Sequence, residues 1–288
     1  RRTRAAKHGW ATTPMGDIPH ADFPPHPRRG CGSIAISGAS RSGLPGEAMT
    51  LETQIEEIAD GIFRISTFVE MAGMRFNQYL IDAEEPLLFH TGQRALFPLV
   101  SKAFARVKPV DSLRWVSWGH LESDESGAMN EWLAASPQAT VAVGFLAAVL
   151  SVNDLADRPP RLLGDDEVID LGGKRVRFLP TPHVPHGWDA GVMFEETTGT
   201  LLCGDLFTQH GDTEAIDHGD LIGPAAAAED AFGSTALTPN TAPTIAALAE
   251  LEPNTLALMH GPAWHGDGAT ALRDLANFYA ERLAASTG

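Results

Sequence analysis

Apolar residues in this chain fall into short extended runs and longer stretches of helical spacing. Between residues 93 and 107, Leu96, Leu99, Val100, Phe104 and Val107 fall on one face at helical spacing, which predicts an amphipathic helix. Short apolar runs between turn residues predict strands at residues 54–58, 62–66, 76–82, 87–89, 113–118, 140–143, 168–171, 175–179, 191–195, 200–203 and 255–259. Further helices are predicted at residues 125–135, 145–152, 224–232, 241–251 and 269–284.

Hairpins open this pattern and recur at the Gly172-Gly173 and Thr198-Gly199 turns, whereas strands and helices alternate in between. Two mixed sheets with helices on both outer faces would bury all of these apolar strands. We therefore expect an α/β (α+β) fold with two central sheets.

Composition separates the first 49 residues from the rest. They hold seven Lys or Arg against three acidic residues, contain Pro24-Pro25 and Pro27, and show no sustained period. Such a segment cannot bury enough apolar surface to offset the entropy of ordering it. We expect residues 1–49 to be a disordered leader or a non-native extension, and residues 50–288 to form a single domain.

Charge and cysteine content limit the kinds of partner and the cellular location that we expect. The formal charge is −16, which argues against nucleic acids and anionic membranes, because both are bound largely through Lys and Arg. Cys31 and Cys203 lie in very different contexts, so no structural disulfide is expected. No apolar run approaches the ~20 residues that a membrane span needs. We expect a cytoplasmic protein with small-molecule or protein partners, and the oligomeric state stays open.

Potential metal ligands follow the ends of four apolar strands. The six candidates are His120, Glu122, Asp124, His183, Asp205 and His260. The first three alternate with other residues, so in an extended or turn-like loop they can point the same way. Each residue alone is more often an ordinary loop or turn residue, but four coincidences after four strands favour a metal site. Six imidazole and carboxylate ligands suffice for two ions of iron, zinc or manganese that share a bridging carboxylate.

The order His-x-[His/Glu]-x-Asp, His, Asp, His resembles the metallo-β-lactamase superfamily over about residues 55–285. Residues 77–82 (NQYLID) and 88–92 (LFHTG) are similar to its entry strands, with His90 where many members have Asp. The resemblance implies an αββα sandwich with a dinuclear site between the sheet edges. Residues 50–288 would then be a single metallo-β-lactamase-like domain.

Hydrolases of this superfamily typically carry His-x-His-x-Asp-His, whereas here Glu122 replaces the second His and Glu125 the last. Anionic oxygen ligands shift the preference from zinc toward iron. The His-x-Glu-x-Asp form resembles the flavodiiron branch and its oxygen-binding di-iron relatives. That resemblance implies terminal ligands at His120, Glu122, His183 and His260, a ligand to the second metal at Asp124, and a bridge at Asp205.

Three residues near these ligands receive supporting roles. His183 is preferred over His186 as the ligand because it stands before x-Pro, as the family's ligand does. His186 and His90 are expected to line the pocket. The role of Glu125 stays open among three alternatives. It could support the ligands from behind, relay protons, or simply belong to the first turn of the next helix, where an acidic residue interacts favourably with the helix dipole.

The resemblance implies a non-haem di-iron protein, with two iron ions, that binds or reduces O2 or NO. Flavodiiron reductases continue into a flavodoxin-like domain, which is not found in this sequence. We therefore expect no flavin in this chain, and either a separate redox donor protein or a role as an oxygen sensor. The alternative is a hydrolase with two zinc ions that cleaves an ester, thioester or phosphodiester. The loss of two histidines argues against that alternative.

Overall fold

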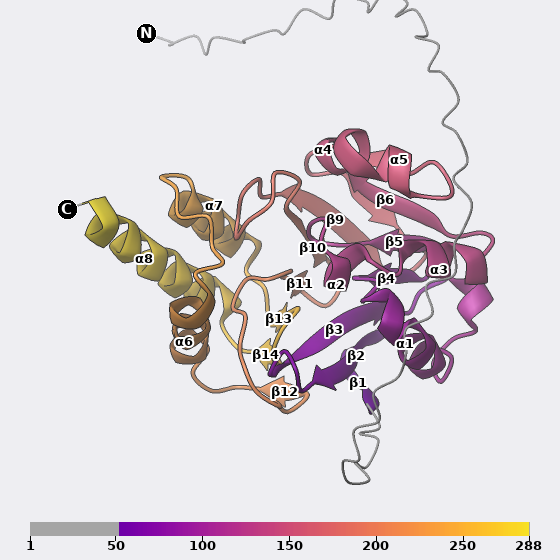
Figure 1. Ribbon diagram of the computed structural model, residues 1–288, viewed down its shortest axis with the longest axis horizontal. Helices are drawn as coiled ribbons and strands as arrows, with labels where there is room; N and C mark the ends of the chain where they lie inside the picture. Colours follow the sequence, from indigo (N-terminus) through magenta and orange to yellow (C-terminus); the bar gives the residue numbers. More distant parts are fainter. Residues whose placement is uncertain (1–51, 288) are drawn as a thin grey trace, which may run out of the picture. The chain divides into compact units, whose positions relative to one another are not determined.

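Two mixed β-sheets form the centre of the computed structural model, which describes residues 52–287 (Figure 1). The predicted leader, residues 1–49, lies outside the described residues. The first sheet has the strand order β1-β2-β3-β4-β5-β6-β7. Its strands are β1 (Thr53–Ala59), β2 (Ile62–Val69), β3 (Met74–Ile81), β4 (Leu87–Phe89), β5 (Trp115–Ser117), β6 (Thr140–Gly144) and β7 (Arg161–Leu163).

The second sheet has the order β12-β14-β13-β11-β10-β9-β8. Its strands are β8 (Val168–Asp170), β9 (Arg175–Pro180), β10 (Gly191–Glu195), β11 (Thr200–Leu202), β12 (Ile216–Asp217), β13 (Thr255–Ala257) and β14 (Ala263–His265). Both sheets contain antiparallel and parallel strand pairs. The hairpins are antiparallel, whereas β4, β5, β6 and β7 pair in parallel, as do β11 and β13. The expectation of two mixed sheets is confirmed.

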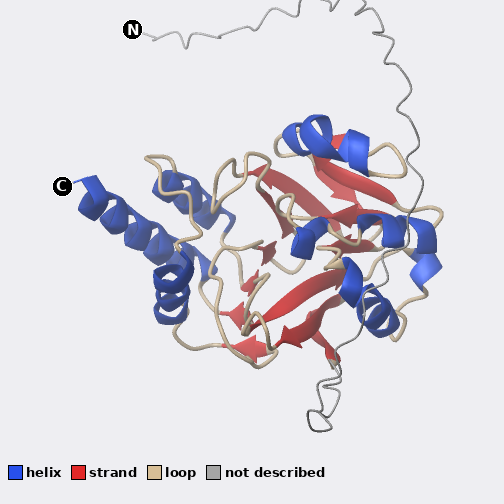
Figure 2. Ribbon diagram, in the orientation of Figure 1, coloured by secondary structure: helices blue, strands red, loops and turns tan. Residues whose placement is uncertain are grey.

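Helices flank the strands (Figure 2). The α-helices are α1 (Phe97–Phe104), α2 (Ser123–Ser126), α3 (Met129–Ala135), α4 (Phe145–Ala147), α5 (Asn153–Leu155), α6 (Ile222–Phe232), α7 (Thr241–Leu248) and α8 (Gly268–Thr287). Short 3-10 or π turns are η1 (Arg94–Leu96), η2 (Val110–Ser112), η3 (Ala148–Val152) and η4 (Ala249–Leu251). The Asp267 carboxylate accepts the Thr270 N–H at 3.0 Å and so caps the start of α8. No helix among residues 52–287 is long and apolar enough to cross a membrane.

Three apolar layers hold the elements together. Phe104 of α1 and Trp132 of α3 pack against the outer face of the first sheet. Leu272 of α8 belongs to the matching cluster outside the second sheet. Between the sheets, residues such as Phe89 and Met193 meet in a third buried cluster. Helix, sheet, sheet and helix therefore form four layers, and the αββα sandwich predicted from the sequence is confirmed.

Three strands escape prediction from the sequence: β7, β12 and β14. Each has only two or three residues, too few for a pattern of apolar positions to stand out from a loop. They form because a longer neighbour offers backbone partners. Leu162, for example, pairs with Val143 of β6 although its side chain is half exposed.

Candidate metal centre

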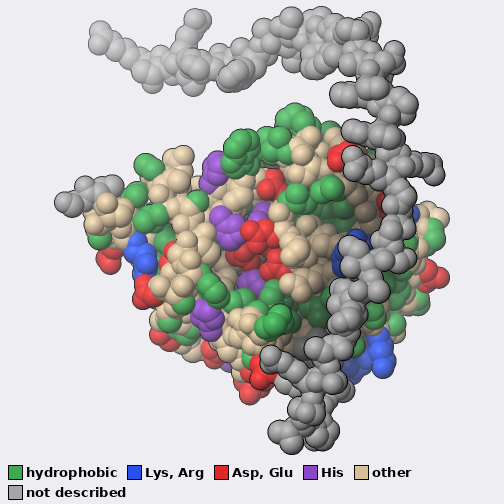
Figure 3. Space-filling model, viewed as in Figure 1, with side chains coloured by type: hydrophobic (Ala, Val, Ile, Leu, Met, Phe, Trp, Pro, Cys, Tyr) green, Lys and Arg blue, Asp and Glu red, His purple; other side chains and the backbone are tan. Residues whose placement is uncertain are grey.

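Four loops bring acidic and histidine side chains to one edge of the sandwich. His120 follows β5 of the first sheet, whereas Asp205 and His260 follow β11 and β13 of the second. The loop after β9 adds His186. Acidic and histidine side chains gather on this face beside α2 (Figure 3). The site therefore lies where the loops of both sheets meet.

Four side chains surround what we call the first metal position: His120, Glu122, His186 and Asp205. One donor atom of each lies within 4.8 Å of all the others. His186 Nε2 is 3.4 Å from both Glu122 Oε1 and Asp205 Oδ2. His120 Nε2 is 3.6 Å from Glu122 Oε1 and 3.8 Å from Asp205 Oδ2. Two imidazoles and two carboxylates thus converge on one point.

The second metal position is formed by Asp124, Asp205 and His260. His260 Nε2 lies 3.3 Å from Asp124 Oδ2 and 3.5 Å from Asp205 Oδ1. Asp205 therefore faces the first position with Oδ2 and the second with Oδ1. One carboxylate between two groups of ligands is the arrangement of a bridged dinuclear site.

These spacings suit co-ligands of a metal better than direct ion pairs. Charge-assisted N–H···O bonds are about 2.7 to 2.9 Å long. Two ligand atoms that each lie about 2.1 Å from one ion, at tetrahedral angles, are about 3.4 Å apart. The observed 3.3 to 3.8 Å follow the second pattern. Within the described chain, His120 Nε2 and Asp205 Oδ1 are also buried without a hydrogen-bond partner. The donor set therefore fits two metal ions.

Buried hydrogen bonds orient His260 and its loop. The Arg75 carbonyl lies 2.8 Å from His260 Nδ1, so Nδ1–H donates there and Nε2 is left to face the second position. Arg64 Nη2 and Asn77 Nδ2 both donate to the Gly261 carbonyl, at 2.9 and 2.8 Å. Sequence patterns did not identify these supports, because the donors lie on strands β2 and β3, nearly 200 residues earlier.

The electrostatics of the metal-free site favour a cation. Burial lowers the pKa of His260, but the neighbouring Asp124 and Asp205 carboxylates outweigh it and raise the pKa to about 9. Burial opposes protonation of His120 as well, yet Glu125, Glu122 and Asp205 raise its pKa to about 12. The imidazoles of His260 and His120 are therefore positively charged at neutral pH without metal. A bound metal would displace one proton from each.

The structure differs from the sequence expectation at His183. His186, not His183, reaches the first metal position. The His183 N–H donates to the Gly187 carbonyl at 2.7 Å, which closes a tight loop, and His183 itself has φ of 66° and is exposed. Val184 is buried in this loop, so the preceding side chain points outward. In an irregular loop, side-chain direction follows no repeating pattern. The sequence alone therefore cannot tell which of two histidines three residues apart faces the site.

Glu122 and Asp124 do not point the same way, as they would in the predicted extended or turn-like loop. Glu122 has extended dihedrals, but Ser123–Ser126 form the helical turn α2. The turn rotates Asp124 away from Glu122, toward His260. Neighbouring carboxylates therefore serve different metal positions, a separation that a continuous strand would not provide.

Glu125 and His90 lie behind His120, away from the pocket. Both are fully buried, and Glu125 Oε1 is 3.3 Å from His120 Nδ1 and 3.6 Å from His90 Nε2. Burial lowers the pKa of His90. His90 was expected to line the pocket but does not. His186, expected to line it too, enters the site itself.

Comparison with known proteins places this chain in a family. A family model described as ODP family beta-lactamase matches residues 74–261, a range that contains all six residues of the two metal positions. The chain belongs to the ODP family. The resemblance to the metallo-β-lactamase superfamily and its flavodiiron proteins, predicted from the sequence, is confirmed by this match and by the relatives described next.

Relatives of this ODP domain include longer proteins. It is 27% identical over 200 residues to a putative diflavin flavoprotein A 1 of Nostoc, covering 66% of this chain and 34% of that protein. The metal-soaked Flv1 flavodiiron core of Synechocystis matches its fold with a TM-score of 0.66 and 23% identity, over 81% of this chain and 61% of that one. The rubredoxin oxygen:oxidoreductase of Desulfovibrio gigas matches with a TM-score of 0.68 and 19% identity, over 80% and 62%. The chain spans about a third of the length of the Nostoc relative.

An open hollow of about 410 Å³ leads to the metal positions of the ODP domain. Apart from the ligands, its lining residues are Met74, Thr208, Phe232 and Ser234. The Thr208 hydroxyl donates to the Asp205 carbonyl at 2.8 Å. A small molecule can therefore reach both metal positions between two large apolar side chains and two hydroxyls.

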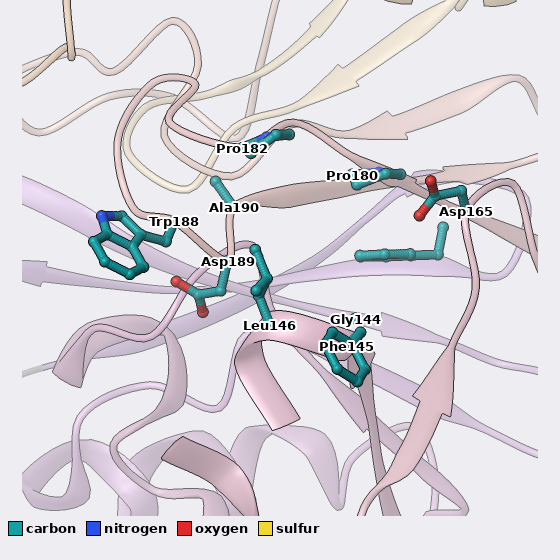
Figure 4. Close-up of a pocket in the computed structure, with 10 residues that line it drawn as sticks. Gly144, Phe145, Leu146, Asp165, Pro180, Pro182, Trp188, Asp189 and Ala190 are labelled. Atoms are coloured by element: carbon teal, nitrogen blue, oxygen red, sulfur yellow. The ribbon is translucent and has the colours of Figure 1, made fainter. Parts of the chain in front are cut away.

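A second hollow of about 310 Å³ is lined in part by Pro182, Trp188 and Asp189 of the loop that carries His186 (Figure 4). Trp188, Phe145 and Leu146 line it, and Trp188 is 64% exposed. Among its lining residues only Asp165 and Asp189 are ionisable, and no metal ligand reaches it. Asp189 Oδ2 accepts the Leu121 N–H at 3.0 Å and so ties the His186 loop to the His120 loop. We place the chemistry in the first hollow.

Proposed function

We propose that this chain holds two iron ions, at the first and second metal positions, and binds or reduces O2 or NO there. The observation that carries the proposal is the position of Asp205, whose two oxygens face two separate groups of ligands. Such a bridge would hold two ions within the few ångströms that joint action on one small molecule needs.

The kind of ligand supports iron over zinc. Among residues 52–287, the two positions combine three imidazoles with three carboxylates and no cysteine. Mixed imidazole and carboxylate sites with open positions are typical of non-haem iron. The relatives point the same way, because one is named a flavodiiron core and another an oxygen:oxidoreductase.

Iron ions at these positions would supply the redox chemistry. The chain's own residues position them and shape the approach. The Glu122 carboxylate is half exposed at the mouth of the hollow, whereas Asp205 and His260 lie deeper. Met74 and Phe232 give the approach an apolar wall suited to small uncharged molecules such as O2 and NO.

We further propose that electrons reach the site from a separate redox donor protein. A cytoplasmic location remains our expectation, and it agrees with the buried free thiol of Cys203.

Metal analysis of the purified protein, with anaerobic visible spectra before and after O2, tests the proposal. We expect about two irons per chain and a new charge-transfer band after O2 is added. Two zinc ions together with turnover of an ester, thioester or phosphodiester would instead support the hydrolase alternative.

Glu122→His tests why iron is preferred. This variant restores the imidazole found in hydrolases, so we expect the ratio of bound iron to bound zinc to fall at the first position. Glu131→His is the matched control, because Glu131 pairs with Arg94 outside the site. If Glu122→His leaves iron content and O2 reactivity intact, the ligand argument for iron is wrong.

A further inference from the structure

A buried carboxylate sits directly behind His120. Glu125 follows Asp124 in the chain, but its carboxylate lies against His120, whereas that of Asp124 lies against His260. Its Oε2 accepts the backbone N–H of His120 at 2.5 Å, and its Oε1 lies 3.3 Å from His120 Nδ1. One carboxylate thus contacts both the backbone and the ring of a predicted metal ligand.

His90 lies directly behind Glu125, and the Glu125 backbone is held by Thr91. His90 Nε2 lies 3.6 Å from Glu125 Oε1, while His90 Nδ1 is 3.1 Å from the Asn77 carbonyl. The Thr91 hydroxyl donates to the Glu125 carbonyl at 3.1 Å. His90 and Glu125 are both fully buried. The row His90, Glu125, His120 therefore runs from the interior of the sandwich to the first metal position.

The neighbouring glycine leaves room for this carboxylate. A Cβ placed on Gly119 would lie 3.0 Å from Glu125 Oε2 and 3.1 Å from Oε1. Such contacts are too close for a buried side chain that has no space to retreat. Gly119 therefore permits Glu125 to approach the backbone of His120.

A ligating imidazole needs an acceptor on its second nitrogen, because that contact fixes the tautomer and the ring orientation. His260 uses the backbone carbonyl of Arg75 for this purpose, whereas the group facing Nδ1 of His120 is the Glu125 carboxylate. An anionic acceptor also makes the imidazole a stronger donor to a metal.

We propose that Glu125 is a positioning residue that holds His120 with Nε2 toward the first metal position, and that His90 positions Glu125 in turn. Because the Glu125 carboxylate serves His120, the second position keeps three protein ligands. This inference rests on the proposed metal centre, but it does not depend on which metal binds or on any reaction with O2.

Titration of the metal-free protein with Co²⁺ tests the inference. Co²⁺ absorption bands report both occupancy and coordination geometry, and His186→Ala and His260→Ala assign the two binding steps. For Glu125→Gln we expect about 10- to 100-fold weaker binding at the first position, within the range known for residues behind metal ligands. The bands of that position should shift, and the second step should change less than about threefold. Gly119→Ala and His90→Asn should act in the same direction, His90→Asn more weakly.

Glu131→Gln is the control, because it changes a carboxylate on the adjacent helix α3 that pairs with Arg94 at the surface. Unchanged Co²⁺ affinity and bands in Glu125→Gln would overturn the inference. Equal weakening of both steps would overturn it too, since that outcome indicates general structural support. If wild-type protein binds two Co²⁺ but its iron form neither binds nor reduces O2 or NO, the proposed function is wrong. The Co²⁺ titration would still test the role of Glu125.

Discussion

Two imidazoles and two carboxylates surround the first metal position, whereas one imidazole and two carboxylates surround the second. Fewer ligands bind a metal less tightly and leave more of its coordination sphere open. The second position should therefore lose its ion more easily and offer more room to an exogenous molecule. A site that joins a firmly held ion to an open one suits the binding of a small molecule between them.

The two positions also differ in what lies behind their imidazoles. A buried carboxylate backs His120, and a backbone carbonyl backs His260. Side-chain substitution can change the first support but not the second. Substitutions on the two sides of Asp205 should therefore separate the two binding steps, and only Asp205 itself should affect both.

The largest effect is expected for Asp205→Asn. An amide is a neutral and weaker ligand, and this one would replace the bridge, so binding at both positions should weaken by at least about 100-fold. Chelator competition and metal analysis measure this loss. Asp230→Asn, which changes an exposed carboxylate paired with Arg282, should retain both ions. Loss at a single position would show that Asp205 is not shared.

His186→Ala should weaken the first position by about 100-fold and leave the second nearly unchanged. The matched variant His183→Ala removes the exposed histidine of the same loop and should alter neither by more than about twofold. Two-step metal titration of both variants compares them directly. If His183→Ala has the larger effect, the loop conformation seen here is not the one that binds metal.

Sequence patterns predicted the layers of the fold well, because long apolar strands and amphipathic helices carry their own periods. They also placed His120, Asp205 and His260 at strand ends, and the structure brings these residues together. The sequence could not separate His183 from His186, because which of them faces the site depends on a turn closed by a backbone hydrogen bond. No spacing rule reports which way such a loop turns.

Supports behind the ligands were harder to predict for a different reason. Asn77 and Arg64 hold the Gly261 carbonyl across nearly 200 residues, and a contact between distant segments leaves no local pattern. The motif marks Glu125, because it stands in place of the last His of the hydrolase pattern, but no sequence pattern determines its role. Its role becomes clear when the distances to His120 and His90 are known.

The stability of the metal-free protein should depend on pH through His260. Its pKa is about 9 in the folded state and about 6.5 when unfolded. A raised folded pKa contributes stability that is fully present below pH 6.5 and is lost as pH rises through 9. Between pH 6.5 and 8 the free energy of unfolding should fall by about 1 to 2 kcal/mol more than in His260→Asn. Denaturant unfolding at both pH values measures it, and equal slopes in the two proteins would contradict the assignment.

The smallest effect is expected where the two loops of the first position meet. Asp189→Ala removes the acceptor of the Leu121 N–H, a loss of about 1 kcal/mol of stability. Because Leu121 follows His120, affinity at the first position should fall by severalfold while the second step stays unchanged. Asp165→Ala is the control, since it removes the other carboxylate of the same hollow without touching the His120 loop (Figure 4). Equal effects of Asp189→Ala on both binding steps would mean that this hydrogen bond stabilises the sandwich edge as a whole, and that the two metal positions are less independent than their ligands suggest.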